Sequence, residues 1–379
     1  MPLVFLGALL CSLFLCSVIP LYIKSFLYAV SLSIKECLIF SLPFIIFALV
    51  FSAISKLGAK ALKYVLIIMP LICISNFANT MLSYFSSSLF LGGINVSSFS
   101  ETANSLTPCF EFSLKKIISN NFALVFGLVS GILLDILNKN IAFKLTSIFD
   151  NFTKYFFKIL IPVMPFFVAG TAIKLQHEGI LKSICEQYLP VLVVFIATAY
   201  TWVFIQFFML AKLRTSKVAE YLKNIFPAII TALGSMSSLA ALPFSIKAAE
   251  KNSKQKENAA IVIPASVNIH LVGDCFFIPM MAIAVMTSFG MEFPSFSQYI
   301  GFAFQFMLMK FAVAAIPGGG VLVMLPIMQT YLGLTSDMLA LVTTLYFLFD
   351  PVITSCNVAG NGAFAIIFDK ITQIRFSKK

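Results

Sequence analysis

The residues best suited to bind a solute lie in an apolar stretch near the C-terminal end, residues 347–369. Asp350 comes first, and Thr354 and Asn357 follow it four and seven positions later. On a helix this spacing places the three side chains on one face, where all of them can reach one bound solute. An ionised carboxylate is costly in a bilayer core, so Asp350 should face a protein cavity and not lipid. The alternative is that Asp350 lies at a helix end and is capped by its own backbone. We also expect a turn at residues 358–361, Val-Ala-Gly-Asn.

Two other apolar segments are interrupted by small or polar residues. Residues 234–238, Gly-Ser-Met-Ser-Ser, interrupt the run 225–246, and residues 316–320, Ile-Pro-Gly-Gly-Gly, interrupt the run 299–332. Non-helical backbone cannot face lipid, because each unpaired N–H or C=O group there is costly. Both interruptions therefore predict loops that line a protein cavity inside a membrane.

Composition places these segments in a bilayer. Apolar residues make up 60% of the 379 positions and charged residues only 11%, which is typical of a polytopic membrane protein and not of a soluble domain. The net charge of +11 comes from Lys and Arg in short loops between apolar runs, a pattern that indicates cytoplasmic loops and excludes a nucleic-acid footprint. The eight cysteines form no CxxC pair and the two histidines lie far apart, so we expect neither disulfides nor a metal centre.

The apolar runs predict an all-α protein with eight membrane spans and two re-entrant helical hairpins. Lysines flank the run 225–246 on both sides, and a single crossing cannot begin and end on one side of the membrane. The C-terminal half then has the order of an inverted-topology repeat, with a solute site where the hairpin tips meet. The predicted spans are residues 3–23, 37–54, 64–90, 122–137, 156–173, 189–213, about 259–288 and about 335–369, with hairpins at about 225–246 and 299–332 and an external loop at 92–119.

These motifs, in this order, resemble the dicarboxylate/amino acid:cation symporter family, which has the glutamate-transporter fold. The run Ser237-Ser238-Leu239-Ala240-Ala241-Leu242-Pro243 is similar to that family's serine-rich first hairpin tip, and residues 316–320 are similar to its second tip. Residues 357–361, Asn-Val-Ala-Gly-Asn, look like its last-helix Asn-x-x-Gly-Asp/Asn element. Residues 264–274 occupy the place of its seventh-helix Asn-Met-Asp-Gly-Thr motif. The resemblance covers about residues 188–369.

The resemblance implies a homotrimer. From the placement of Lys and Arg we expect both termini to be cytoplasmic, and we expect the protein to lie in a cell (inner) membrane. Residues 1–63 (helices 1 and 2) and 91–188 (helices 4 and 5 with the external loop) would form a scaffold. Residues 64–90 (helix 3) and 189–379 would form a mobile transport domain. It also implies that the chain is not an enzyme and needs no cofactor beyond a coupling Na⁺ or H⁺.

The resemblance also implies roles for individual residues. Asp350 would hold a substrate ammonium, and backbone N–H groups of the hairpin tips would bind a carboxylate. Acidic-substrate members carry an Arg three residues after this Asp, where this chain has Ile353, so we predict a neutral amino acid as substrate. The expected substrate-binding residues are Ser237, Ser238, Asp274, Ile316, Gly318, Gly319, Gly320, Asp350, Ile353, Thr354 and Asn357.

The positions expected to bind the coupling cation depart from the family pattern. Its sodium-liganding Asn and Asp correspond to His270 and Val272, which offer no hard oxygen ligands, so we predict coupling to protons through His270 or Asp274. Lys310 falls where the second hairpin helps to form another sodium site, and its ammonium could replace the ion. The expected cation-coupling residues are Ser266, Asn268, His270, Lys310, Asn357 and Asn361. A His270 that is merely hydrogen-bonded in the core, and uncoupled exchange, remain alternatives.

Other functions fit the sequence less well. The main alternative is a sodium-coupled symporter of glutamate, aspartate or a dicarboxylate. An intramembrane enzyme would have only Ser237 with His270 as nucleophile and base, without a third orienting residue. A channel would need a continuous polar stripe, and paired hairpins fit alternating access better. The polar stretch from Asn79 to Ser88 could add cation ligands or simply bond its own backbone.

Overall fold

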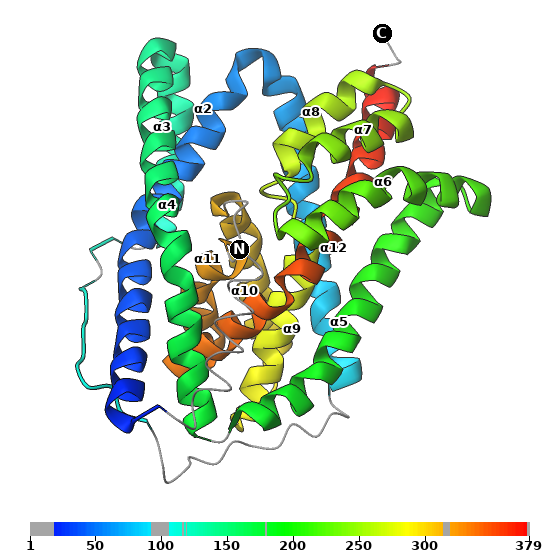
Figure 1. Ribbon diagram of the computed structural model, residues 1–379. Helices are drawn as coiled ribbons and strands as arrows, with labels where there is room; N and C mark the ends of the chain where they lie inside the picture. Colours follow the sequence, from blue (N-terminus) through cyan, green and yellow to red (C-terminus); the bar gives the residue numbers. More distant parts are fainter. Residues whose placement is uncertain are drawn as a thin grey trace.

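A computed structural model describes residues 19–91, 106–115, 117–118, 120–178, 180–313 and 319–376. All regular structure in these residues is helical, which confirms the predicted all-α class (Figure 1). The helices are α2 (Leu21–Phe90), α3 (Asn120–Leu137), α4 (Lys139–His177), α5 (Ile180–Leu210), α6 (Thr215–Ser235), α7 (Leu242–Asn252), α8 (Lys256–Ser266), α9 (Val272–Ser288), α10 (Phe296–Met309), η2 (Lys310–Ala312), α11 (Gly319–Ile327), η3 (Met328–Leu332) and α12 (Ser336–Phe376).

Helix α2 contains two of the predicted spans, residues 37–54 and 64–90. Its 70 residues would extend about 105 Å if straight. Figure 1 shows instead that α2 rises, turns over at one end of the molecule and returns, so that its halves form two antiparallel arms. The loop that we expected between these spans is therefore a bent part of the helix. Most of the predicted span 3–23 and most of the predicted external loop 92–119 lie outside the described residues.

The next helices follow the predicted spans with shifted ends. Helix α3 matches the run 122–137, and α5 covers most of 189–213. Helix α4 begins well before the predicted span 156–173, because the side-chain oxygen of Asn138 caps it by accepting the Ile141 N–H at 3.2 Å. In the described part of the chain, three segments are long and apolar enough to cross a membrane, namely Ile67–Phe90, Tyr188–Leu210 and Ser336–Gln373.

Both predicted interruptions separate paired helices. Helix α6 ends at Ser235, Met236 adopts a left-handed conformation with φ of 53°, and α7 begins at Leu242 and packs against α6. In the second hairpin, α10 ends at Met309, the turn η2 follows, and α11 begins at Gly319. Residues 314–318, which include the predicted site residues Ile316 and Gly318, lie outside the described residues.

A further break separates α8 from α9 at residues 267–271, within the predicted span 259–288. The polar backbone of this break is bonded inside the protein. The side chain of Asn76 on α2 donates to the carbonyl oxygen of Ile269 at 2.7 Å, and the His270 N–H donates to the Ser266 carbonyl at 2.8 Å. These bonds satisfy backbone groups that could not face lipid.

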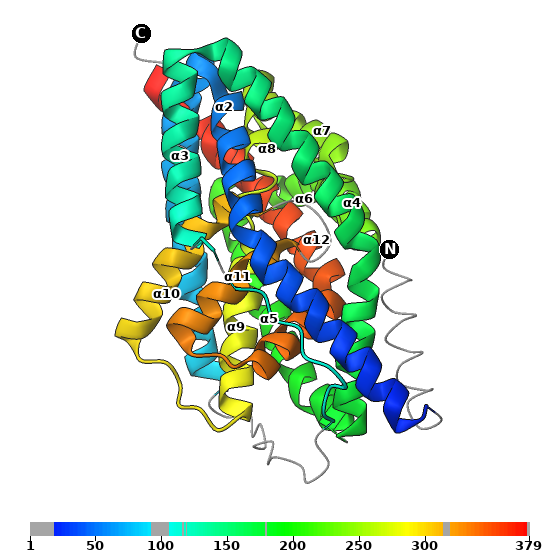
Figure 2. The ribbon, with the colours of Figure 1, turned by 90° about the vertical axis from the view of Figure 1, so that its left-hand side faces the viewer.

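The turn that we predicted at residues 358–361 is wrong, because α12 runs unbroken from Ser336 to Phe376. Its glycine serves packing instead. A Cβ on Gly360 would lie 2.4 Å from Cγ2 of Val272, and a Cβ on Gly273 would lie 2.3 Å from the backbone oxygen of Ile353. Glycine at both positions therefore lets α9 and α12 approach closely. Both views place α12 in the middle of the molecule (Figures 1 and 2).

We predict that Gly273→Ala lowers the thermal stability of the detergent-purified protein by about 1–3 kcal/mol, because the new methyl group meets a backbone oxygen that cannot move away cheaply. The matched control is Gly234→Ala, since a Cβ on Gly234 has no atom within 4 Å. Thermal unfolding of both variants measures the difference. Equal midpoints for the two variants would contradict the close approach of α9 to α12.

Candidate functional site

The two hairpins, the α8–α9 break and α12 meet at one small cavity. Its volume is about 20 Å³, which is room for about one water molecule. A larger solute can therefore enter only if one of these elements moves. The lining residues are Met236 and Ser238 from the first hairpin, Val313 and Gly320 from the second, Leu271 and Asp274 from the α8–α9 region, and Tyr346, Asp350, Thr354 and Asn357 from α12.

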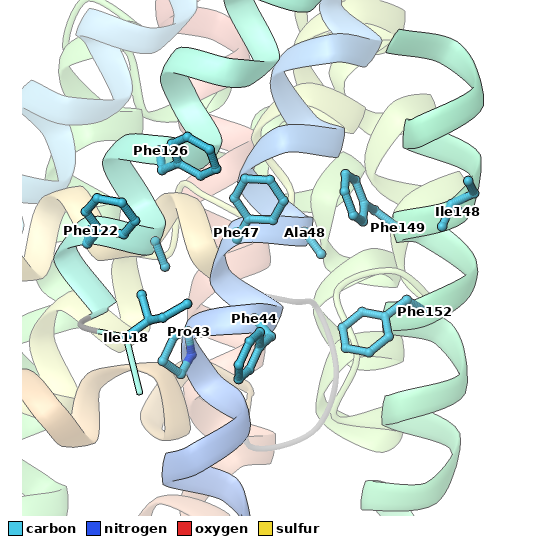
Figure 3. A pocket seen from close by; sticks show the side chains of 11 residues that line it. Pro43, Phe44, Phe47, Ala48, Ile118, Phe122, Phe126, Ile148, Phe149 and Phe152 are labelled. Atoms are coloured by element: carbon cyan, nitrogen blue, oxygen red, sulfur yellow. The ribbon is translucent and has the colours of Figure 1, made fainter. Parts of the chain in front are cut away.

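A larger cavity of about 440 Å³ lies between α2, α3 and α4 (Figure 3). Its walls are apolar and largely aromatic, with Phe44, Phe47, Phe122, Phe126 and Phe149 among them. It offers no polar group that could orient a charged or hydrogen-bonding solute. We therefore place the candidate site at the smaller cavity, where four polar side chains of α12 converge with Asp274.

Asp350 and Thr354 form a buried hydrogen-bonded pair in this cavity. The Thr354 hydroxyl donates to Oδ1 of Asp350 at 2.7 Å, and the two residues are 2% and 5% exposed. Asn357 lines the same cavity, as expected from the shared helix face. Asp350 lies inside α12, far from its ends, so the alternative of a carboxylate that caps a helix end does not hold.

Asp274 is the most heavily bonded side chain of the site. Its Oδ2 accepts from Nζ of Lys310 at 2.9 Å. Its Oδ1 accepts from the Tyr346 hydroxyl and from Nδ2 of Asn357, each at 3.0 Å. The Asp274 backbone N–H donates in turn to Oδ1 of Asn357 at 3.2 Å. One carboxylate thus joins α9, the turn η2 and α12.

The second hairpin closes on the same carboxylate. A Cβ on Gly320 would lie 2.1 Å from Oδ2 of Asp274 and 2.6 Å from the Tyr346 hydroxyl, so only glycine fits there. Gly319, also predicted as a site residue, is the first residue of α11 and is buried. The first N–H groups of a helix lack partners within it and can bind an anion. The start of α11 therefore brings anion-binding capacity to the cavity wall.

The predicted substrate residues Ser237 and Ile353 do not line the cavity. Ser238 lines the cavity, but Ser237 does not, and its hydroxyl oxygen accepts from the Ala240 N–H at 3.3 Å. Ile353 is fully buried yet does not line the cavity, and its backbone oxygen faces Gly273. The directions of the Ser237 and Ser238 side chains depend on the backbone of the first hairpin tip, and that of Ile353 depends on how α12 packs against α9. A sequence motif specifies neither.

His270 lies in a second polar cluster. The residue is 1% exposed, its Nε2 is 2.8 Å from the Ser75 hydroxyl, and its Nδ1 is 3.1 Å from Oδ1 of Asn361. Its ring stacks on Phe364 with centroids 4.3 Å apart. The Ser75 hydroxyl oxygen and Oδ1 of Asn361 can each accept a hydrogen bond from a ring N–H. Both the neutral and the protonated imidazole therefore find hydrogen-bond partners here. Because Ser75 and Asn361 occupy its nitrogens, the structure does not pair His270 with Ser237 as an enzyme would require.

The remaining predicted cation-coupling residues differ in how they are bonded. The Ser266 hydroxyl donates to the Ile263 carbonyl of its own helix at 3.4 Å. Oδ1 of Asn268 and Nδ2 of Asn361 are buried and have no hydrogen-bond partner. Lys310 bonds Asp274, and an ammonium at 2.9 Å from a carboxylate oxygen repels a metal cation there. The residues around Asp274 therefore do not fit a sodium ion. In the described residues, no cluster of three or more His, Cys, Asp or Glu could hold a metal.

The polar stretch on the second arm of α2 combines both expected behaviours. The Thr80 hydroxyl donates to the Asn76 carbonyl of its own helix at 2.8 Å. The Ser83 hydroxyl instead donates across to the Phe276 carbonyl at 2.7 Å, and Oδ1 of Asn79 accepts from the Trp202 indole at 2.7 Å. This arm thereby fastens α5 and α9 beside the site.

Sequence reasoning missed two residues that complete these clusters. Tyr346 lies four positions before Asp350, so the helical spacing that grouped Asp350 with Thr354 could also have found it. Ser75 lies 195 positions from its partner His270. No spacing rule connects such distant positions, because only the packing of α2 beside the α8–α9 break brings them together.

The sequence model described as the sodium:dicarboxylate symporter family matches residues 2–371. Excitatory amino acid transporter 1 of Homo sapiens is 24% identical over 260 residues, which is 66% of this chain and 46% of that protein. The proton/sodium-glutamate symport protein of Geobacillus stearothermophilus is 26% identical over 216 residues, 54% of this chain and 51% of that protein. This chain thus matches about half the length of these relatives.

Proposed function

Because this chain belongs to the sodium:dicarboxylate symporter family, we propose that it is a secondary active symporter that carries a small amino acid across a membrane by alternating access. The family is one of transporters, which confirms the prediction that the chain is not an enzyme. The observation that carries the proposal is the cavity at which both hairpins meet the polar face of α12. Because the cavity is small, one of the elements that line it must move before a solute can enter.

The substrate that these residues fit best is a neutral amino acid. The Asp350 carboxylate, held by Thr354, would bind the ammonium group, and the first N–H groups of α11 would bind the α-carboxylate. Ile353 supplies no positive charge for a second carboxylate. Of the remaining proposed residues, Ser238, Gly320, Asn357 and Asp274 line the cavity. The Asp274 carboxylate also bonds Asn357 and Tyr346.

The coupling ion that we propose is a proton held by His270. Ser75 and Asn361 can accept hydrogen bonds from a charged ring, so protonation needs no rearrangement beyond rotation of one hydroxyl. Asp274 is the second candidate for the coupling proton, and Lys310, Tyr346 and Asn357 already bond its carboxylate.

The oligomeric state and domain division that we propose also rest on membership of this family. We propose a homotrimer in a cell membrane, with residues 1–63 and 91–188 as scaffold and residues 64–90 and 189–379 as the moving domain. The packing of α12 against α6 and α9 supports a single moving unit. Both termini would be cytoplasmic, together with the lysine-rich segment 247–256.

A sodium-coupled symporter of an acidic amino acid is the second candidate. The names of two relatives favour it, since one is an excitatory amino acid transporter and the other a proton/sodium-glutamate symport protein. In this chain the residue three positions after Asp350 is Ile353 and a lysine bonds Asp274. These two features favour the neutral substrate and argue against sodium at Asp274.

A binding screen of amino acids against the purified protein tests the site. We expect saturable binding of a neutral amino acid, its loss in Asp350→Ala, and about tenfold or greater weakening in Thr354→Val, because the hydrogen bond to a charged carboxylate is removed. Thr344→Val is the matched control, since that hydroxyl donates to the Ala340 carbonyl of its own helix. Full binding by Asp350→Ala would refute the assignment.

Substrate charge is tested at position 353. Ile353→Arg should admit aspartate or glutamate, because a guanidinium beside the site can pair with a second carboxylate. Ile353→Met, which introduces an unbranched side chain without charge, serves as the control. Competition binding with neutral and acidic amino acids measures the change. A wild-type protein that already binds aspartate best would contradict the neutral-substrate proposal.

The coupling ion is tested in proteoliposomes. Wild-type uptake should rise when the outside is made acidic relative to the inside, since an inward proton gradient then drives the substrate inward. His270→Gln can keep both hydrogen bonds but cannot carry the proton, so it should retain exchange and lose the response to the pH gradient. The matched control is His177→Gln, which changes the chain's second histidine. Uptake that depends on a sodium gradient alone would overturn the proposal.

A further inference from the structure

The ion pair between Lys310 and Asp274 is buried as deeply as any charged contact in the described part of the chain. The side chains are 0% and 1% exposed, with Nζ at 2.9 Å from Oδ2. Breaking such a pair by removing one partner is strongly destabilising, because the other charge stays buried without compensation. The pair therefore constrains every state in which these two side chains remain inside the protein.

The pair ties the second hairpin to α9. Lys310 begins the turn η2 at the end of the first hairpin arm, and Asp274 lies in the first turn of α9. Gly320 at the start of the second arm rests against the same Oδ2. Both arms of the hairpin thus meet one carboxylate oxygen, and the hairpin cannot lift from α9 without separating the charges.

The ammonium is held in place from its other side as well. Nζ of Lys310 lies 4.5 Å from the ring centroid of Phe306, one helical turn earlier on the same arm. A cation over an aromatic face is attracted by the ring, so this contact adds to the stabilisation that the ion pair gives the ammonium. Because Lys310 and Phe306 belong to the same hairpin arm, the ammonium stays attached to the hairpin when the hairpin moves.

We propose that Lys310 is a tethered cation that takes the place of a dissociable metal ion at Asp274 and holds the second hairpin closed. This proposal rests on the proposed function only in treating that hairpin as the gate of the site. It follows that closure of the hairpin needs no external cation at this carboxylate. It also follows that removing the ammonium creates a site for a small cation, since the Asp274 carboxylate and Tyr346 hydroxyl supply hard oxygen ligands.

The test is hydrogen–deuterium exchange of the hairpin, residues 299–332, in the purified full-length protein, with sodium chloride or choline chloride at equal ionic strength. Lys310→Met should speed exchange there by roughly tenfold or more in choline, and sodium should reverse much of this effect. In the double variant Lys310→Met/Asp274→Asn the sodium effect should vanish and exchange should return toward the wild-type rate. Lys217→Met is the control, since Lys217 lies over the Tyr221 ring at the surface.

The proposal is overturned if Lys310→Met exchanges like the wild type, if sodium slows the wild type as much as the variant, or if the double variant keeps the sodium effect. If Lys310→Met alone does not fold, the double variant should restore a monodisperse protein, and its failure to do so would also overturn the proposal. Hairpin exchange is read without any substrate. A failed amino-acid screen would refute the proposed function and leave this result standing.

Discussion

The site depends on the close contact between α9 and α12, which is possible because glycines without a Cβ lie where the two helices meet. Gly273 faces the Ile353 carbonyl, and Gly360 faces Val272. This approach places Asp274, the residue after Gly273, within hydrogen-bonding reach of Asn357 through both its backbone and its carboxylate. A larger residue at either glycine would separate the helices and pull apart the bonds that organise the cavity.

Several buried polar groups near the site find their hydrogen-bond partners on a different element. The α8–α9 break is bonded by Asn76 from α2, and the carboxylate on α9 is bonded from η2 and α12. The hydroxyl of Ser83 likewise bonds a carbonyl of α9. In a membrane such bonds are needed because neither lipid nor bulk water can replace them. They also make the position of each element depend on its neighbours.

The sequence was sufficient to predict where most of the site residues lie, but not which contacts they make. Asp350 and Thr354 share a helix face that spacing alone identifies. The serine- and glycine-rich interruptions mark both hairpins, because non-helical backbone inside a membrane must line a protein cavity. Gly360 was misread as a turn, because a glycine that permits close packing looks the same in a sequence as one that ends a helix. The bond between His270 and Ser75 could not be predicted, since it depends on how distant helices pack.

Trp202, the single tryptophan of the chain, gives the molecule an optical reporter of its own. Its indole N–H donates to Asn79, so the fluorophore sits at the junction of α5 with the second arm of α2. Indole emission shifts toward longer wavelengths as its surroundings become more polar or its hydrogen bond changes. Tilting of α5 against that arm would therefore shift the tryptophan emission maximum of the unlabelled protein, and no other tryptophan would contribute to the signal.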